Sequence, residues 1–134
     1  MSLEQAIHER WAESGELSAL LPAERLTTGR AFGDKKPYAT IESLVRRPAL
    51  ATNSGNVVKA VSLNLCIWHD NFDEGENIVE CVQTVFDHAV FNLPDNSAAI
   101  RMRQVSQSVG QEKNGTWLWK IELAARICTP LASS

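Results

Sequence analysis

The stretch 57–90 constrains the fold most, because a strand pattern is followed there by a helix pattern. Large aliphatic residues occupy every second position from Val61 to Ile67, with smaller or polar residues between them. This period of two predicts a strand over Val57–Trp68 with one buried face. A helical period then predicts a helix over about Glu74–Val90 with one apolar stripe. The residues of that stripe are Ile78, Val82, Val85, Phe86 and Ala89.

The residues before this helix predict how it begins. Asp73, with Glu76 three residues later, matches the capping-box pattern. Glu74 adds a negative charge near the positive end of the helix dipole. We therefore expect Asp73 to be the N-cap and these acidic residues to stabilise the helix.

The N-terminal part of the chain predicts a small helical cover followed by a loop. Ser2 is a plausible N-cap, and Gly15 offers a stop for the first helix. A short second helical turn is expected over Glu16–Leu21. The segment Arg25–Pro37 is rich in Gly, Thr and charged residues, which predicts a loop.

Three further strands are predicted by β-forming residues and turn signals. Tyr38–Val45 precedes the central strand, and Ala99–Val109 and Thr116–Cys128 flank the strong hairpin signal Asn114-Gly115. The order is α-β-β-α-β-β. It predicts a single α+β domain over residues 1–134, with an antiparallel four-stranded sheet of two hairpins and helices packed on one face.

The predicted central strand is long for a domain of this size. Val57–Trp68 would extend ~40 Å at ~3.3 Å per residue, whereas a compact chain of 134 residues has a radius of gyration of only ~14 Å. The strand must therefore bend, or the hairpin tip must project beyond the body. A projecting polar hairpin and open sheet edges are suited to contact with a neighbouring subunit.

The composition indicates a globular protein, with 44% hydrophobic and 22% charged residues. The net charge of −3 argues against a nucleic-acid binder. No apolar run is long enough to cross a bilayer, and the first residues do not form a signal peptide. The three cysteines, Cys66, Cys81 and Cys128, lie within apolar patterns and are expected to be reduced core thiols.

One group of residues suggests a metal site. His69, Asp70 and Asp73 lie between the central strand and the helix. Isolated His and Asp residues in a loop lack the spacing of metal motifs, so a solvated loop is the favoured interpretation. No catalytic, cofactor or metal-binding residue is predicted. A small cytosolic metal-dependent enzyme that uses this region is the alternative from another functional class.

Several arginines are candidates for an interaction surface. An arginine-rich nucleic-acid platform is an alternative, but subunit contacts fit the acidic chain better. Trp117 and Trp119 alternate with polar positions, which favours core packing over interface anchoring. The predicted interface residues are Arg46, Arg47, Arg101 and Arg103.

Four short motifs in this layout resemble those of a known family. They are Lys36–Ile41, the strand that ends in Ile67-Trp68, the helix entry Asp73–Glu76, and the final strand segment Leu123–Ile127. Together they resemble the small tail-terminator, or tail-completion, minor tail proteins of tailed phages and prophages.

The resemblance implies a structural role without catalysis or a cofactor. Such proteins form homo-oligomeric rings, typically hexamers, that terminate the tail tube and support head joining. The implied partners are further copies of the chain, the tail tube protein and a head-completion or connector protein, with no membrane. The implied location is the virion tail, or the host cytoplasm during assembly. A head–tail connector, or neck, protein is the alternative in the same setting.

Overall fold

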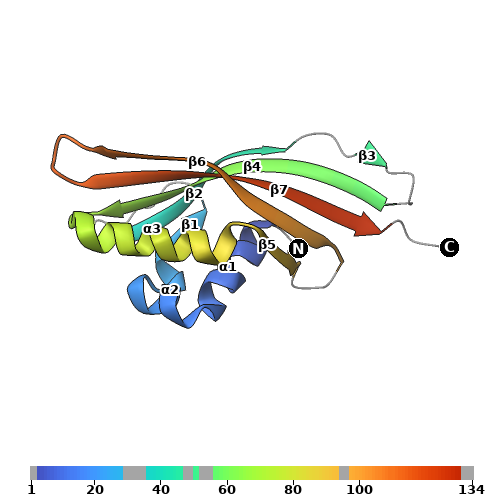
Figure 1. The fold of residues 1–134 in the computed structure, drawn as a ribbon, viewed down its shortest axis with the longest axis horizontal. Helices are drawn as coiled ribbons and strands as arrows, with labels where there is room; N and C mark the ends of the chain where they lie inside the picture. The colour runs from blue at the N-terminus through green and yellow to red at the C-terminus, as the bar shows by residue number, and fades with distance from the viewer. Residues whose placement is uncertain (1–2, 29–35, 47–49, 52–55, 94–96, 131–134) are drawn as a thin grey trace.

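The computed structural model describes residues 3–28, 36–46, 50–51, 56–93 and 97–130. Its helices lie together on one side of a long, curved sheet (Figure 1). None of the helices in these residues is long and apolar enough to span a membrane. The helices are α1 (Leu3–Glu13), α2 (Gly15–Leu20), the short 3-10 helix η1 (Ala23–Arg25) and α3 (Phe72–Phe86). The strands are β1 (Leu26–Thr28), β2 (Tyr38–Arg46), β3 (Leu50–Ala51), β4 (Asn56–His69), β5 (Ala89–Asn92), β6 (Ala99–Gln111) and β7 (Trp117–Pro130).

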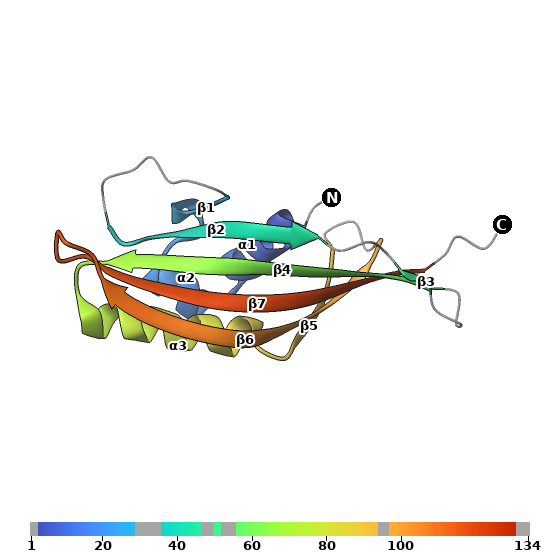
Figure 2. The same cartoon turned by 90° about the horizontal axis from the view of Figure 1, so that it is seen from above.

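The sheet is larger than the sequence predicted. Its order is β1-β2-β4-β7-β6-β5, and β3 also pairs with β4. The four predicted strands lie side by side as β2, β4, β7 and β6 (Figure 2), and the α+β class with helices on one face is confirmed. The antiparallel four-stranded sheet is wrong. β1, β3 and β5 are additional strands, and β1 pairs with β2 in parallel.

Two of the additional strands lie where the sequence predicted other structure. β1 lies inside the predicted loop, next to β2, which supplies its hydrogen-bond partners. β5 lies in the predicted C-terminal turn of the helix, because α3 ends at Phe86 and His88 takes a left-handed backbone conformation with φ 58°. Histidine is among the residues enriched at positive φ. The chain then turns and pairs with β6.

The helix α3 also begins earlier than predicted. The side chain of Asn71 accepts a hydrogen bond from the backbone N–H of Glu74 at 2.9 Å, so Asn71 is the N-cap. The predicted cap at Asp73 is therefore wrong. Asp73 and Glu74 lie in the first turn, where their charges complement the helix dipole.

The core lies between the helices and the sheet. Alternate residues of β4 and β7 are buried against α3 and α1, and Trp119 is fully buried as predicted. Gly75 of α3 lies directly on the Trp119 ring, since a Cβ at this position would overlap it. Trp117 is only partly buried and packs edge-on against Phe72 with ring centroids 4.8 Å apart. The largest fully buried side chains are Trp11, Trp119, Phe86, Ile7, Leu17 and Leu21.

The central strands extend beyond the helical layer at one end. β4 and β7 pair over their whole lengths, from Asn56↔Pro130 to His69↔Trp117. At the His69 end they lie over α3, but at the other end they run past the helices (Figure 1). The residues at 57–60 and 126–129 are half-buried or exposed, and none is fully buried. The sequence left a bent strand and a projecting tip as alternatives, and in the structure β4 runs past the helices within a curved sheet. We call these residues the uncovered end of the sheet.

Candidate interaction surface

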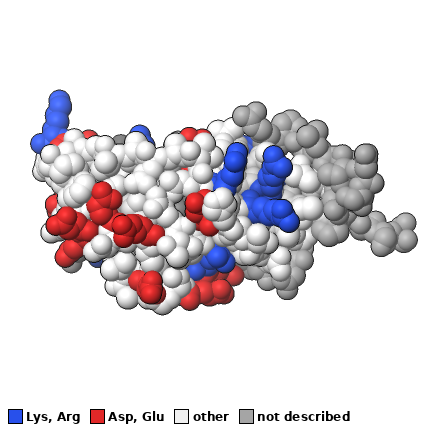
Figure 3. All heavy atoms as spheres, viewed as in Figure 1, with Lys and Arg blue, Asp and Glu red and all other residues white. Residues whose placement is uncertain are grey.

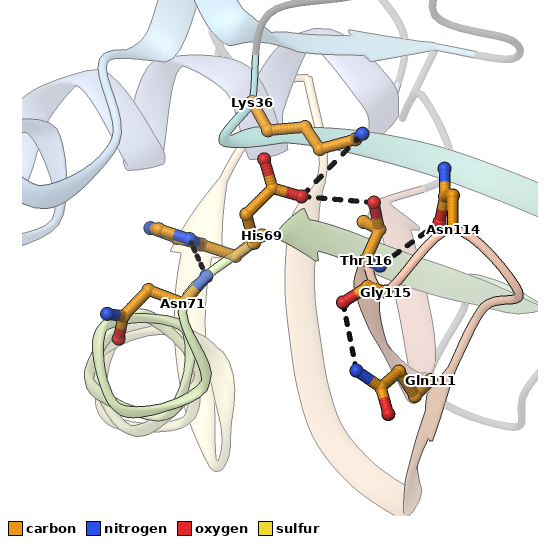
Figure 4. Close-up of polar contacts among 8 residues, drawn as sticks. Lys36, His69, Asn71, Gln111, Asn114, Gly115 and Thr116 are labelled. Carbon is orange, nitrogen blue, oxygen red and sulfur yellow. Dashed lines mark hydrogen bonds and ion pairs between the residues drawn. The ribbon is translucent and has the colours of Figure 1, made fainter.

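The junction between β4 and α3 holds the residues of the predicted metal site. His69 is buried, so it does not lie in the solvated loop that the sequence favoured. Its Nδ1 accepts a hydrogen bond from the backbone N–H of Asn71 at 2.9 Å (Figure 4). Its Nε2 lies 3.3 Å from a carboxylate oxygen of Glu74. Both imidazole nitrogens therefore have partners that belong to the start of α3.

Asp70 contacts a different set of residues. One of its carboxylate oxygens accepts a hydrogen bond from the Thr116 hydroxyl at 3.0 Å and lies 3.7 Å from Lys36 Nζ (Figure 4). Thr116 belongs to the turn between β6 and β7, and Lys36 precedes β2. The carboxylate thus joins three segments that are distant in sequence.

This junction is an arrangement of structural contacts. Asp73 is exposed on α3, and across the described ranges no three His, Cys, Asp or Glu side chains are grouped so that they could hold a metal ion. The turn at 112–116 confirms the predicted Asn114-Gly115 hairpin, with Gly115 at φ 90°. The contacts of Asp70 and His69 fix this turn and the start of α3 to the end of β4.

The predicted interface arginines do not lie together. Arg46, at the end of β2, forms an ion pair with Glu4 of α1 at 3.0 Å. Arg47 lies outside the described residues. Arg101 and Arg103 lie on β6 with exposed side chains, next to Met102, which is buried between them. The structure therefore separates Arg46 from the β6 pair.

Sequence reasoning missed a third arginine that lies beside Arg101 and Arg103. Arg126 of β7 is exposed and stands directly opposite Arg101 in the β6–β7 register. The three arginines line a hollow of about 690 Å³ next to the uncovered end of the sheet. Lys and Arg side chains gather on this part of the face seen in Figure 3. The alternation of charge in the final strand marks Arg126 as outward-facing, but its pairing with Arg101 depends on the register.

The hollow combines positive charge with exposed apolar surface. Val90 of β5 lines it and is 65% exposed. Val90 pairs with Arg101 in the β5–β6 register. Glu122 also lines the hollow, but its carboxylate accepts a hydrogen bond from the Ser106 hydroxyl at 3.1 Å. We call this set of residues the arginine hollow.

Burial lowers the reactivity of two of the cysteines, Cys66 and Cys81. Burial, with smaller contributions from Glu42, raises the pKa of the Cys66 thiol to about 12. Burial also raises the pKa of Cys81, and the nearby charge of Glu16 adds to this effect. All three cysteines are free thiols; Cys66 is buried as predicted, whereas Cys81 and Cys128 are only partly buried. Since the thiolate is the nucleophilic form, Cys66 is unsuited to nucleophilic chemistry.

Comparisons with known proteins agree with the resemblance seen in the sequence. Residues 5–128 match the family model of tail completion protein gp17. No curated protein matches the chain. Among solved structures, a chain of the virion of a native gene transfer agent particle is similar, with a TM-score of 0.77 at 11% sequence identity over 95% of both chains. At this identity the likeness shows the fold alone.

The family match covers nearly the whole chain. It confirms the predicted resemblance, and the predicted absence of enzymatic activity agrees with a family of structural components of the phage virion tail. The His69 and Asp70 region is accordingly not the site of an enzyme. This chain belongs to the family of tail completion protein gp17, a family of structural phage tail proteins.

Proposed function

We propose that the protein assembles into a homo-oligomeric ring, most simply a hexamer, that terminates the tail tube and supports head joining. The observation that carries this proposal is the uncovered end of the sheet. Strands β4 and β7 continue past the helices, and the arginine hollow lies beside them. A soluble subunit gains little from an uncovered, partly apolar sheet surface unless a partner covers it.

The edges of the sheet support the same proposal. Among the described strands, β1 and β5 are the outermost, and both are short. Beyond Met102, β6 has no strand neighbour other than β7 in the described chain. Its backbone there offers hydrogen-bond groups, and Val105 and Val109 are exposed. Neighbouring subunits in a ring would cover such edges.

Within this proposal the predicted arginines have different roles. Arg101 and Arg103 contact a neighbouring subunit or the tail tube through the arginine hollow. Arg46 is engaged with Glu4 inside the chain, but its side chain remains 61% exposed and available to a second partner. Arg47 stays a predicted interface residue outside the described part of the structure.

Size-exclusion chromatography with light scattering over a concentration series tests the ring. The expected particle has six times the 14.8 kDa mass of the subunit, either at all concentrations or after concentration. A strict monomer at the highest soluble concentration contradicts the proposal. Negative-stain microscopy of the same sample should then show closed rings rather than open filaments.

A binding experiment tests whether the ring lies at the end of the tail tube. The protein is immobilised and offered the tail tube protein and the head connector of the same phage, each alone. Binding of the tail tube protein is expected. Binding of the connector without any binding of the tail tube protein would assign the protein to the neck instead.

A further inference from the structure

The arginine hollow carries a net positive charge, because three arginines and one glutamate line it. Arg101 and Arg126 are direct cross-strand neighbours, and Arg103 is the next outward-facing residue on β6. Like charges directly opposite each other destabilise a sheet. No ion pair to these arginines occurs within the described residues. The Glu122 carboxylate, which accepts a hydrogen bond from Ser106, offsets one of the three positive charges at most. An acidic partner would relieve this repulsion.

The chemistry of the hollow indicates what that partner presents. Guanidinium groups bind carboxylates in a planar, bidentate geometry. The exposed Val90 side chain adds an apolar contact beside them. This combination of arginine with apolar surface is typical of protein–protein interfaces. The partner is therefore expected to be a folded protein surface that carries carboxylates.

The same chain presents such a surface on α3. Asp73, Glu76 and Glu80 recur at spacings of three and four residues, so they share one side of the helix. Asp73 and Glu80 are exposed, Glu76 is half-buried, and none of the three has an ion pair within the described residues. Acidic side chains gather over this part of α3 in Figure 3, well apart from the basic cluster. The two surfaces can therefore meet only between copies.

We propose that the arginine hollow of one copy docks onto the acidic side of α3 in a second copy. This inference rests on the proposed self-assembly and names the surfaces that make the contact. Each copy carries one basic and one acidic surface, so the contact can repeat from copy to copy. Complementary charges of this kind also steer association and make it sensitive to salt.

Reciprocal charge reversal tests the contact. One variant carries Arg101→Glu and Arg126→Glu, and the other carries Glu76→Lys and Glu80→Lys. Asp73 is left unchanged because its charge stabilises the first turn of α3. Light scattering should show that each variant alone self-associates about tenfold or more weakly than the wild type. An equimolar mixture of the two should recover assembly, since each variant then meets its opposite charge.

Two controls keep the experiment interpretable. Lys113→Glu changes the charge of an exposed residue in the β6–β7 turn and should leave assembly unchanged. Thermal unfolding monitored by circular dichroism should show that all variants fold like the wild type. Raising the salt concentration should weaken assembly of the wild type and of the mixture to the same extent, when both start from an equal assembled fraction. A larger effect on the wild type would show that other ionic contacts exist.

The outcomes separate this inference from the proposed ring. If the wild type forms rings and the Arg101/Arg126 variant does so equally well, the contact is wrong while the ring stands. If the reversals abolish association and the mixture recovers it, but only dimers form, the contact stands while the ring is wrong. Failure of the mixture to recover assembly overturns the assignment to α3. If the wild type binds a fluorescent DNA duplex and the Arg101/Arg126 variant loses this binding while it still assembles, the hollow is a nucleic-acid site instead.

Discussion

The two ends of the sheet are built from the same strands, but they differ in what covers them. At the α3 end, Trp119 of β7 is fully buried under Gly75, and Asp70 fixes the β6–β7 turn. At the uncovered end, β4 and β7 continue without a helix beneath them, and Arg126 faces solvent opposite Arg101. The strand pairing is continuous between the two ends.

This difference shows that strand pairing extends farther along the sheet than the hydrophobic core does. Backbone hydrogen bonds extend the sheet as far as a partner strand reaches, whereas the core ends where the helices end. The surplus length costs little because its residues are half-buried or exposed, and it leaves part of the sheet surface uncovered. The following experiments compare the two ends.

The largest contrast is expected in thiol reactivity. Cys66 lies in the covered part of β4 with its pKa raised to about 12, whereas Cys128 lies at the uncovered end of β7. In a Cys81→Ser background, iodoacetamide at pH 8 should label Cys128 long before Cys66, as followed by mass spectrometry. A shift from 9.0 to about 12 lowers the thiolate fraction of Cys66 about a thousandfold at this pH. Equal labelling rates would contradict the burial of Cys66.

The same shift predicts how stability changes with pH. The unfolded thiol loses its proton near pH 9.0, but the folded thiol keeps it to about pH 12. The free energy of unfolding contributed by Cys66 is therefore fully present below pH 9 and falls as the pH rises from 9 to 12. For a Cys66→Ala variant, the free energy of unfolding measured with urea should decline less over this pH range.

The next largest effect is expected from Trp119→Ala. This substitution removes a fully buried ring beneath α3 and leaves a cavity, which should lower the free energy of unfolding by about 3–5 kcal/mol. Urea unfolding followed by circular dichroism measures this loss. A loss below about 1 kcal/mol would show that the covered end is not closely packed.

Gly75→Ala tests the same contact from the side of the helix. A Cβ at Gly75 would overlap the Trp119 ring, and overpacking of this kind costs about 1–3 kcal/mol. Gly15→Ala is the matched control, since a Cβ there would meet no atom within 4 Å. The control should be neutral or slightly stabilising in the same unfolding measurement.

Valine-to-alanine substitutions compare the covered core with the arginine hollow, which lies beside the uncovered end. Val82→Ala, in the covered part of α3, should cost about 2 kcal/mol because Val82 is fully buried. Val90→Ala, in the arginine hollow, should change the free energy of unfolding by less than about 0.5 kcal/mol. Val90→Ala should nevertheless weaken self-association in light scattering. Equal losses of stability at both positions would remove the distinction between the covered core and the arginine hollow.

A smaller effect than that of Val82→Ala is expected at the cap of α3. Asn71→Ala removes the hydrogen bond to the Glu74 N–H and should cost about 1 kcal/mol. Asn77→Ala, at an exposed position within the same helix, should be neutral or slightly stabilising. A larger effect at Asn77 than at Asn71 would contradict the observed cap.

The strongly periodic parts of the fold could be predicted from the sequence. The alternation from Val61 to Ile67 identified the central strand, because one of its faces is buried by the helices. The short strands were missed for a physical reason. Three residues of β1 and four of β5 are too few to show a period, and their pairing comes from neighbours distant in sequence. The cap at Asn71 was missed because Asp73 and Glu76 match the same pattern two residues later.

The candidate surface was only partly predictable. Arg101 and Arg103 were identified because their strand alternates clearly between apolar and charged residues. Arg126 was not, since its position opposite Arg101 depends on the hairpin register and on the irregularity between Gln104 and Ser106. Arg46 was grouped with them although it pairs with Glu4. Charge alone does not reveal which arginines meet in space.

The pairing of β4 with β7 has a consequence for when an assembly-competent subunit exists. Its partners are separated along the chain by 48 residues at His69↔Trp117 and by 74 at Asn56↔Pro130. Long-range pairing of this kind makes folding slow, because distant segments must lose chain entropy to meet before their contacts stabilise them. The arginine hollow, which we propose as a docking surface, is completed only when β7 brings Arg126 opposite Arg101. A chain in which β7 has not yet paired with β4 and β6 therefore lacks the proposed docking surface.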